Sequence, residues 1–137
     1  MKKRVNFLEE TFALLKLENI TAIHGRAEEF AKNKAYREQY DLCVSRAVSN
    51  LATLSEYCLP YVKVGGNFIS YKSGTVQEEL QQAEKAVKIL GGKIQDVVYF
   101  NLPDSEIQRS LVVIEKMKPT PGRYPRKAGT PLKEPLS

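Results

Sequence analysis

The sequence predicts an α/β fold in which a mostly parallel sheet ends in an antiparallel hairpin. Over most of the 137 residues, segments with the periodicity of amphipathic helices alternate with short runs of β-branched and apolar residues. Such alternation is typical of parallel strands that are connected by helices packed on the faces of a sheet. The last two strand-like segments follow each other without a helix, so they add one antiparallel strand.

Helical spacing and stop signals define the expected helices. Apolar residues recur at intervals of three and four, while Pro60 and the pair Gly91-Gly92 end two of the segments. The expected helices and helical turns cover residues 4–17, 26–33, 35–40, 51–60 and 75–90.

Strands are expected where β-branched and apolar residues cluster. The segment after Asn19 is expected to form a strand that ends near His24, and the run around Cys43 has the pattern of a buried strand. Gly65 and Gly66 are expected to form a turn before the next strand. The expected strands cover residues 19–24, 40–48, 67–72, 93–102 and 109–117.

The surplus positive charge of the chain is confined to its end. Residues 116–137 carry six Lys/Arg and one acid, and this net +5 equals the formal net charge of the whole chain. Five of the seven prolines follow Lys118. We therefore expect an α/β domain over residues 1–118 and a basic tail without regular elements over residues 119–137. From composition alone, the tail either contacts a polyanion or only aids solubility.

The composition also argues against several classes of protein. No apolar run approaches the ~20 residues that span a bilayer, and Glu9 and Glu10 follow the basic N-terminus too closely for a signal peptide. Cys43 and Cys58 lie in apolar surroundings without C-x-x-C spacing, which is typical of reduced core thiols in a cytoplasmic protein. With His24 as the single histidine, no metal site is expected.

Four stretches carry a resemblance to a known family: "KRVNFLEE", "HGRAEEF", "SRAVSNLATLSEYCLPYVKVGG" and "PTPGRYPRKAGTPLKEPL". Together they resemble the small-subunit (16S) ribosomal RNA guanine-N7 methyltransferases, also called glucose-inhibited division protein B. The resemblance implies a class I, Rossmann-like fold and a cytoplasmic enzyme with S-adenosyl-L-methionine as methyl donor. It also implies that small-subunit ribosomal RNA, or the 30S subunit, is the partner.

The sequence departs from this family in one respect, because it contains no G-x-G motif for a cofactor-binding turn. It looks like the C-terminal part of the family, starting past the glycine turn and the acid that binds the ribose. The fold is therefore expected to be incomplete, and the chain to be weak or inactive as a methyltransferase by itself. The alternative is a truncated, non-catalytic RNA-binding remnant of the same family.

The resemblance also implies the strand order 3-2-1-4-5-7-6. Residues 19–24 would be strand 3 and residues 40–48 strand 4, with the two strands between them missing. The edges of that gap would expose unpaired backbone groups. Strand 3 then docks directly on strand 4, frays, or pairs with a second chain, and in the last case the protein self-associates.

Three residues are expected at the cofactor. By resemblance, Ala27 and Glu28 follow strand 3, where the family holds the adenine; the alternative is a simple helix start with acids at its N-terminus. Arg46 follows strand 4 at the carboxyl edge of the sheet, where open α/β folds bind ligands; the alternative is a solvated cap. Guanine N7 carries no proton, so no general base or metal is required and no catalytic residue is predicted.

Five residues are expected at the RNA. Lys72 ends a strand at the same edge and is a candidate phosphate contact, with an ordinary surface lysine as the alternative. In the tail, Arg123, Arg126 and Lys127 surround Tyr124, whose ring is expected to stack on an unpaired base. The basic side chains would gain affinity by releasing counterions from the RNA.

Overall fold

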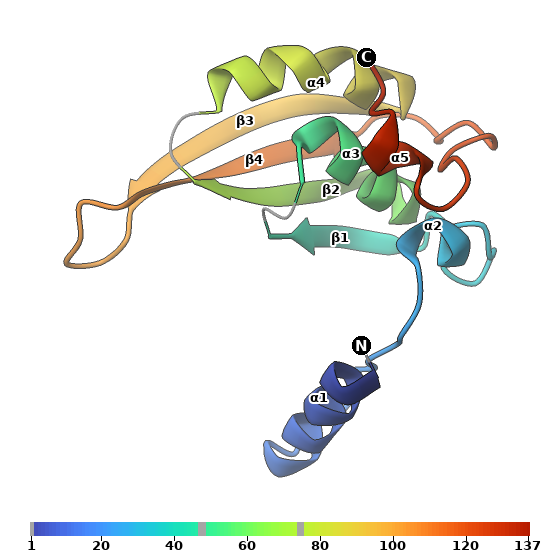
Figure 1. Cartoon of the computed structure of the whole chain (residues 1–137), viewed down its shortest axis with the longest axis vertical. Coiled ribbons are helices and arrows are strands. Elements are labelled where there is room, and N and C mark those ends of the chain that lie inside the picture. Colours follow the sequence, from blue (N-terminus) through green and yellow to red (C-terminus); the bar gives the residue numbers. More distant parts are fainter. Residues whose placement is uncertain (1, 47–48, 74–75) are drawn as a thin grey trace.

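The structure is a computed structural model that describes residues 2–46, 49–73 and 76–137 (Figure 1). The described residues form a four-stranded sheet with the order β1-β2-β4-β3. Its strands are β1 (Tyr40–Ser45), β2 (Val62–Ser73), β3 (Gly92–Asn101) and β4 (Gln108–Lys116). β1 and β2 are parallel, and β4 is antiparallel to both β2 and β3. This order corresponds to strands 4-5-7-6 of the expected sheet, so the predicted closing hairpin is confirmed.

Two helices cover one face of the sheet. α3 (Leu51–Cys58) packs on β2 and continues into a short 3-10 turn, η1 (Leu59–Tyr61), while α4 (Gln77–Ile89) packs on β3 (Figure 1). α3 starts at Asn50, whose side chain accepts a hydrogen bond of 2.9 Å from the backbone N–H of Thr53. α4 ends before Gly91, whose φ of +93° is the left-handed conformation typical of a helix stop.

Burial alternates along the strands, as expected for a sheet that is covered on one side only. Phe68 of β2 and Val112 and Ile114 of β4 are fully buried beneath the helices. On the opposite face, Tyr71 of β2 and Val98 of β3 are 50% and 42% exposed. The core of the described residues therefore lies between the sheet and the pair α3 and α4.

The first strand of the sheet departs from the sequence-based expectation. The run around Cys43 does form β1, but Leu42 and Val44 are 53% and 59% exposed rather than buried. The physical reason is that Leu42 and Val44 pair with Asn67 and Ile69 on the face of the sheet that α3 and α4 leave uncovered, while β1 is also an edge strand with a partner on one side only. Its outer edge leaves backbone groups available for another strand.

The glycine pair Gly65-Gly66 lies inside β2 and not in a turn before a strand, so that prediction was wrong. Tyr40 of β1 pairs with Val62, whereas Leu42 pairs with Asn67, and the residues between them form a bulge within a continuous strand. Gly65 has a φ of +91°, which fits an extra residue in a bulged strand. A side chain on the neighbouring glycine, Gly66, would come within 2.6 Å of a carbonyl oxygen of β1.

The predicted strand over residues 19–24 is absent from the sheet. The segment has no regular secondary structure and no partner strand, and Ile20 and Ile23 are about half exposed. A strand gains its stability from neighbours, and no neighbouring strand for it exists among the described residues. Of the three outcomes considered for this segment, direct docking on strand 4 is not found among the described residues.

The N-terminal helix forms as predicted but does not pack on the sheet. α1 (Lys2–Leu14) stands apart from the other elements (Figure 1). Its apolar residues are exposed accordingly, with Phe7 at 66% and Leu14 at 83%. The chain then runs through residues 15–26 to α2 (Ala27–Phe30), a single turn beside the first residues of β1.

The tail is ordered against the domain, which differs from the prediction of a segment without regular elements. It contains a short helix, α5 (Thr130–Lys133), that packs on α3. The hydroxyl of Thr53 donates a hydrogen bond of 3.0 Å to the carbonyl oxygen of Pro131. Prolines prevent long regular elements, but they do not prevent an irregular segment from docking through hydrogen bonds.

Candidate functional site

The carboxyl edge of the parallel strands holds the first candidate site. Arg46 directly follows β1, and its exposed side chain borders a hollow of about 270 Å³. The other lining residues are Val44, Ser45 and Tyr71. The hydroxyl of Ser45 donates a hydrogen bond of 3.1 Å to the carbonyl oxygen of Arg46. The structure therefore places Arg46 at the edge where parallel α/β sheets bind ligands, as the sequence predicted.

Lys72 lies near the same edge but is not available to RNA. Its side chain is 6% exposed, and its ammonium donates a hydrogen bond of 2.6 Å to the carbonyl oxygen of Ser49. The same ammonium lies 2.7 Å from Oε2 of Glu79 on α4. Lys72 thus connects β2 to the start of α4, and this burial is at odds with a phosphate contact.

Ala27 and Glu28 lie at the opposite end of β1 from Arg46. The carbonyl oxygen of Ala27 accepts a hydrogen bond of 2.5 Å from the hydroxyl of Tyr61, which precedes the first residue of β2. Figure 1 shows α2 next to the beginning of β1, whereas Arg46 follows the end of that strand. The structure therefore does not bring the three predicted cofactor residues together. The reason is that residues 19–24 form no strand that would carry α2 to the carboxyl edge.

The carboxylate of Glu28 is already occupied. It is 2% exposed, and its Oε2 accepts hydrogen bonds from Arg26 Nη2 at 3.0 Å and from the backbone N–H of Gly129 at 2.9 Å. Burial raises the pKa of Glu28, but these hydrogen bonds lower it by more, so the net pKa lies below its ordinary value. Glu28 therefore acts as an anchor for the tail.

The described residues do not fit a complete S-adenosylmethionine site. The hollow beside Arg46 is slightly smaller than the roughly 300–1,000 Å³ of ordinary small-molecule sites, and it is bounded by residues of two strands only. Residues on the adenine side, Ala27 and Glu28, are engaged elsewhere. No group of three or more His, Cys, Asp or Glu side chains within residues 2–46, 49–73 and 76–137 could hold a metal ion.

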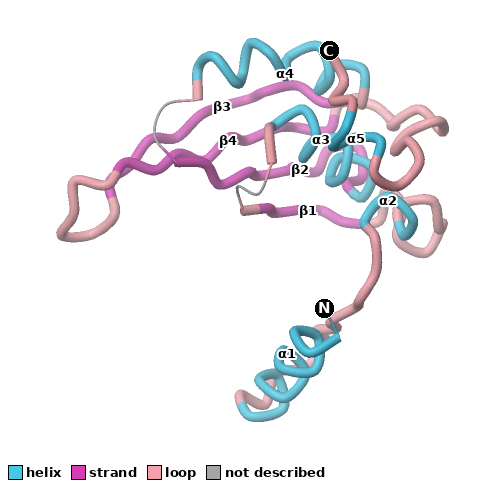
Figure 2. The backbone as a smooth tube through the Cα atoms, viewed as in Figure 1, coloured by secondary structure: helices cyan, strands magenta, loops and turns pink. Residues whose placement is uncertain are grey.

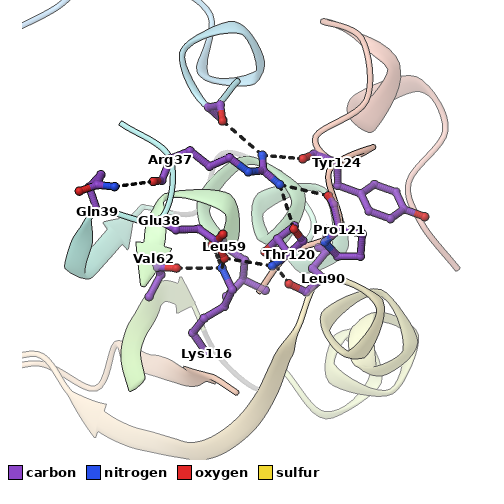
Figure 3. A network of polar contacts seen from close by, with 11 residues as sticks. Arg37, Glu38, Gln39, Leu59, Val62, Leu90, Lys116, Thr120, Pro121 and Tyr124 are labelled. Carbon is purple, nitrogen blue, oxygen red and sulfur yellow. Dashed lines mark hydrogen bonds and ion pairs between the residues drawn. The ribbon is translucent and has the colours of Figure 1, made fainter. Parts of the chain in front are cut away.

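A second cluster of polar residues fixes the tail at the other end of the sheet, where two loop regions lie together (Figure 2). Arg37, in the loop after α2, points its guanidinium at a series of backbone carbonyls (Figure 3). It donates hydrogen bonds to the carbonyl oxygens of Ala31 at 3.2 Å, Thr120 at 3.0 Å, Pro121 at 3.1 Å and Tyr124 at 2.8 Å. Three of these acceptors belong to the tail, so Arg37 holds the first residues of the tail in place through hydrogen bonds.

Lys116 and Glu38 complete this cluster (Figure 3). The ammonium of Lys116 is fully buried and donates hydrogen bonds to the carbonyl oxygens of Leu59 at 2.6 Å and Val62 at 2.8 Å. Oε2 of Glu38 lies 3.0 Å from that ammonium and accepts a hydrogen bond of 3.0 Å from the N–H of Thr120. Burial lowers the pKa of Lys116, and the nearby Glu38 only partly offsets this shift.

The predicted RNA residues of the tail separate into two kinds. Tyr124 is 8% exposed and belongs to the core cluster, so its ring does not fit the predicted stacking on a base. The guanidinium of Arg126 pairs with the fully buried carboxylate of Glu56 at 2.8 Å. Arg123 and Lys127 are exposed, and for these two the RNA contact stays a prediction.

Comparison with known proteins identifies the family. The family model described as "rRNA small subunit methyltransferase G" matches residues 1–112. The chain belongs to the rRNA small subunit methyltransferase G family. The expectation from the four sequence stretches is thereby confirmed.

Curated members of the family match the chain almost from end to end. The ribosomal RNA small subunit methyltransferase G of Lachnoclostridium phytofermentans is 55% identical over 136 residues, which are 99% of this chain and 56% of that protein. The Clostridium tetani protein of the same name is 50% identical over 136 residues, covering 99% and 57%. The chain thus spans a little more than half the length of these methyltransferase G proteins, and the match includes nearly all of the docked tail.

A solved structure also resembles the chain, though weakly. The arsenic(III) S-adenosylmethionine methyltransferase from Chlamydomonas reinhardtii matches with a TM-score of 0.41 and 14% identity, covering 74% of this chain and 45% of that one. At this score the match carries no argument about fold or function. Among the described residues of this chain, no helix is both long and apolar enough to cross a membrane.

Proposed function

We propose that this chain forms part of an enzyme that transfers a methyl group from S-adenosyl-L-methionine to guanine N7 of 16S ribosomal RNA. The observation that carries the proposal is the family match over residues 1–112, together with about 50% identity to methyltransferase G proteins over nearly the whole chain. The exposed Arg46 at the carboxyl edge supports it, because that edge is where such sheets bind their ligands.

The 137-residue chain alone is expected to have weak activity or none. The hollow beside Arg46 is small, and Ala27 and Glu28 lie at the other end of β1. Most polar groups of the cofactor would therefore lack partners in this chain. The same observation favours the second candidate function, a non-catalytic RNA-binding remnant of the family.

We further propose that the tail contacts 16S ribosomal RNA or the 30S subunit through Arg123 and Lys127. Both side chains are exposed, unlike Arg126 and Tyr124. The guanidinium of Arg123 lies 5.1 Å from the centroid of the Tyr124 ring, an arrangement that holds the cation at the surface of the ordered tail. Counterion release from the RNA would supply the binding free energy.

Self-association at the free edge of β1 is the remaining proposal. β1 has a partner strand on one side only, and its exposed Leu42 and Val44 adjoin the unpaired backbone. A second copy of the chain that pairs at this edge would satisfy these backbone groups. Light scattering over a range of concentrations tests this, and a monomer at every concentration would contradict it.

The experiment that separates the two functions is a titration with S-adenosylmethionine by calorimetry, followed by methylation of 30S subunits. An incomplete but genuine methyltransferase site predicts weak saturable binding that Arg46→Ala weakens by roughly 10-fold or more, as for a lost hydrogen bond to a charged group. Lys127→Ala is the matched control and should leave the affinity for the cofactor unchanged. Absence of cofactor binding, with RNA still retained at low salt, would favour the remnant.

A further inference from the structure

The stretch of the tail that carries Arg123 is held on both sides by one guanidinium, that of Arg37 (Figure 3). It donates hydrogen bonds to two carbonyl oxygens that precede Arg123 in the chain, those of Thr120 at 3.0 Å and Pro121 at 3.1 Å. It donates a third, of 2.8 Å, to the carbonyl oxygen of Tyr124, which directly follows Arg123. The N–H of Tyr124 in turn donates a hydrogen bond of 3.0 Å to the carbonyl oxygen of Pro121, which closes a turn. Arg123 is therefore an exposed residue of a turn whose two ends are fastened to Arg37.

The loop that carries Arg37 is itself fixed. The backbone N–H groups of Arg37 and Glu38 donate hydrogen bonds to the carbonyl oxygens of Asn33 at 2.9 Å and Pro60 at 2.8 Å. The guanidinium also donates a hydrogen bond of 3.2 Å to the carbonyl oxygen of Ala31, directly after α2. Its two terminal nitrogens thus serve four carbonyl oxygens, which the planar fork of an arginine can do and the single ammonium of a lysine cannot do in the same geometry.

The second exposed basic residue of the inner tail, Lys127, is restrained by its neighbours in the chain. The N–H of Gly129 donates a hydrogen bond of 2.9 Å to the buried carboxylate of Glu28. On the other side of Lys127, the guanidinium of Arg126 is paired with Glu56. Both exposed basic side chains therefore start from backbone positions that the domain has fixed.

We propose that Arg37 is a positioning residue for RNA binding: it holds the turn over residues 120–124 so that Arg123 meets a phosphate from a preset position. A tail that moved freely would lose conformational entropy when it bound, and this loss would weaken the binding. In the docked tail the entropy is already lost on folding. The four N–H groups on the terminal nitrogens of Arg37 are occupied by carbonyl oxygens, so this guanidinium is satisfied without a phosphate. The inference rests on the proposed contact between the tail and 16S ribosomal RNA.

Bound RNA should in turn stabilise the contacts of Arg37. If the docked tail binds RNA more tightly than a free tail does, RNA favours the docked tail by the same factor. RNA should therefore protect the amides of Thr120 and Tyr124, which are hydrogen-bonded in the docked tail, from hydrogen exchange. It should also protect the amide of Glu38, which lies beside Arg37 and outside the proposed RNA contact.

The test is a filter-binding series at increasing salt with 16S ribosomal RNA and the full chain, either unaltered or carrying one substitution. Arg37→Ala should lower the affinity at a given salt by about 5-fold or more, the usual lower bound of coupling between two sites. The slope of log K against log salt should stay the same, because no phosphate contact is lost. Arg37→Lys keeps the charge but not the fork, so it should bind almost as weakly. Arg4→Ala, the matched control, removes an exposed arginine from α1 and should leave the affinity unchanged.

The alternatives give different results. If Arg37 touched the RNA itself, Arg37→Lys would restore the affinity and Arg37→Ala would reduce the magnitude of the slope by about 0.7 to 0.9, and either result overturns the inference. Binding that depends on Arg123 and Lys127 but not on Arg37 overturns the inference and leaves the proposed tail contact intact. Absence of RNA binding to the unaltered chain overturns both.

If Arg37→Ala does not fold, hydrogen exchange of the unaltered chain with and without 16S RNA decides. We expect the peptides that contain Thr120, Tyr124 and Glu38 to exchange about 5-fold more slowly, or slower still, when RNA is bound. Equal exchange of these peptides in the two states overturns the inference.

Discussion

Replacing Arg126 by alanine should release the tail and destabilise the whole domain. The carboxylate of Glu56 on α3 is fully buried, and among the described residues it accepts hydrogen bonds from Arg126 alone. The backbone N–H and the guanidinium of Arg126 reach it at distances of 2.8 to 3.2 Å. The guanidinium also donates a hydrogen bond to the carbonyl oxygen of Glu134 at 2.5 Å. Arg126→Ala would therefore leave a buried charge with only the backbone N–H as partner.

The magnitude follows from the burial of the two partners. Removing one member of a buried ion pair costs about 3–5 kcal/mol, because the other charge stays buried without compensation. The side chain of Arg126 is 26% exposed, so some water reaches the pair and the lower end of that range applies. We expect a loss of about 3 kcal/mol in the free energy of unfolding, which corresponds to a drop in Tm of roughly 10 °C.

Urea unfolding monitored by circular dichroism measures this loss, and Lys127→Ala is the matched control. Lys127 is an exposed neighbour of the same charge, so its replacement should change the stability by less than about 0.5 kcal/mol. Adding Glu56→Gln to Arg126→Ala should recover part of the stability, because a neutral amide costs less to bury than a carboxylate. Equal stabilities of Arg126→Ala and Lys127→Ala would refute the assignment of Arg126 as an anchor.

Three further predictions concern single residues. Gly91→Ala should destabilise the domain by more than Gly65→Ala in thermal melts, since both have a positive φ but only at Gly91 would the new Cβ lie 2.2 Å from a backbone carbonyl oxygen, that of Lys118. Equal losses would contradict this. The hydrogen-bonded carboxylate of Glu28 contributes stability that is complete above its ordinary pKa of 4.5 and is lost as the pH falls through its lowered pKa in the folded protein. Glu28→Gln should remove this contribution, so the free energy of unfolding should depend less on pH below 4.5. Burial raises the pKa of Tyr61 to about 12, and an absorbance titration should lose one late-titrating group in Tyr61→Phe.

The parts of the fold that follow from local signals were predictable from the sequence. α4 has apolar residues at helical spacing and a glycine stop, and the β3–β4 hairpin has two apolar runs with a short loop between them. The segment 19–24 has an equally good local pattern for a strand, yet it forms none. A local pattern does not reveal whether a partner strand is present, nor whether helices cover the face of the sheet on which Leu42 and Val44 lie.

The same distinction between local and long-range signals applies to the residues of the candidate site. Arg46 was placed correctly at the carboxyl edge because it directly follows a strand, which is a local relation. Ala27 and Glu28 were not, because their position depends on segments far away in the chain. Arg37 and Glu56 were missed entirely, since a charged residue in a turn or on a helix gives no local signal that it binds a tail about 70 to 87 positions away.

The ordered tail sets a limit on how much of its charge can serve RNA binding. Of the six basic residues from position 116 to the end of the chain, Lys116 is buried and Arg126 is paired with Glu56. The exposed ones are Lys118, Arg123, Lys127 and Lys133. Each phosphate contact contributes about 0.7 to 0.9 to the slope of log K against log salt, so four contacts limit the slope to a magnitude of about 3 to 4.

Replacing Arg123 and Lys127 together should reduce that slope by about half, and a filter-binding series with 16S RNA at increasing salt measures it. Lys85→Ala, a substitution of an exposed lysine on α4, is the control and should leave the slope unchanged. A slope much steeper than 4 in the unaltered chain would mean that basic residues outside the tail bind the RNA. An unchanged slope in the double variant would mean that Arg123 and Lys127 do not contact the RNA.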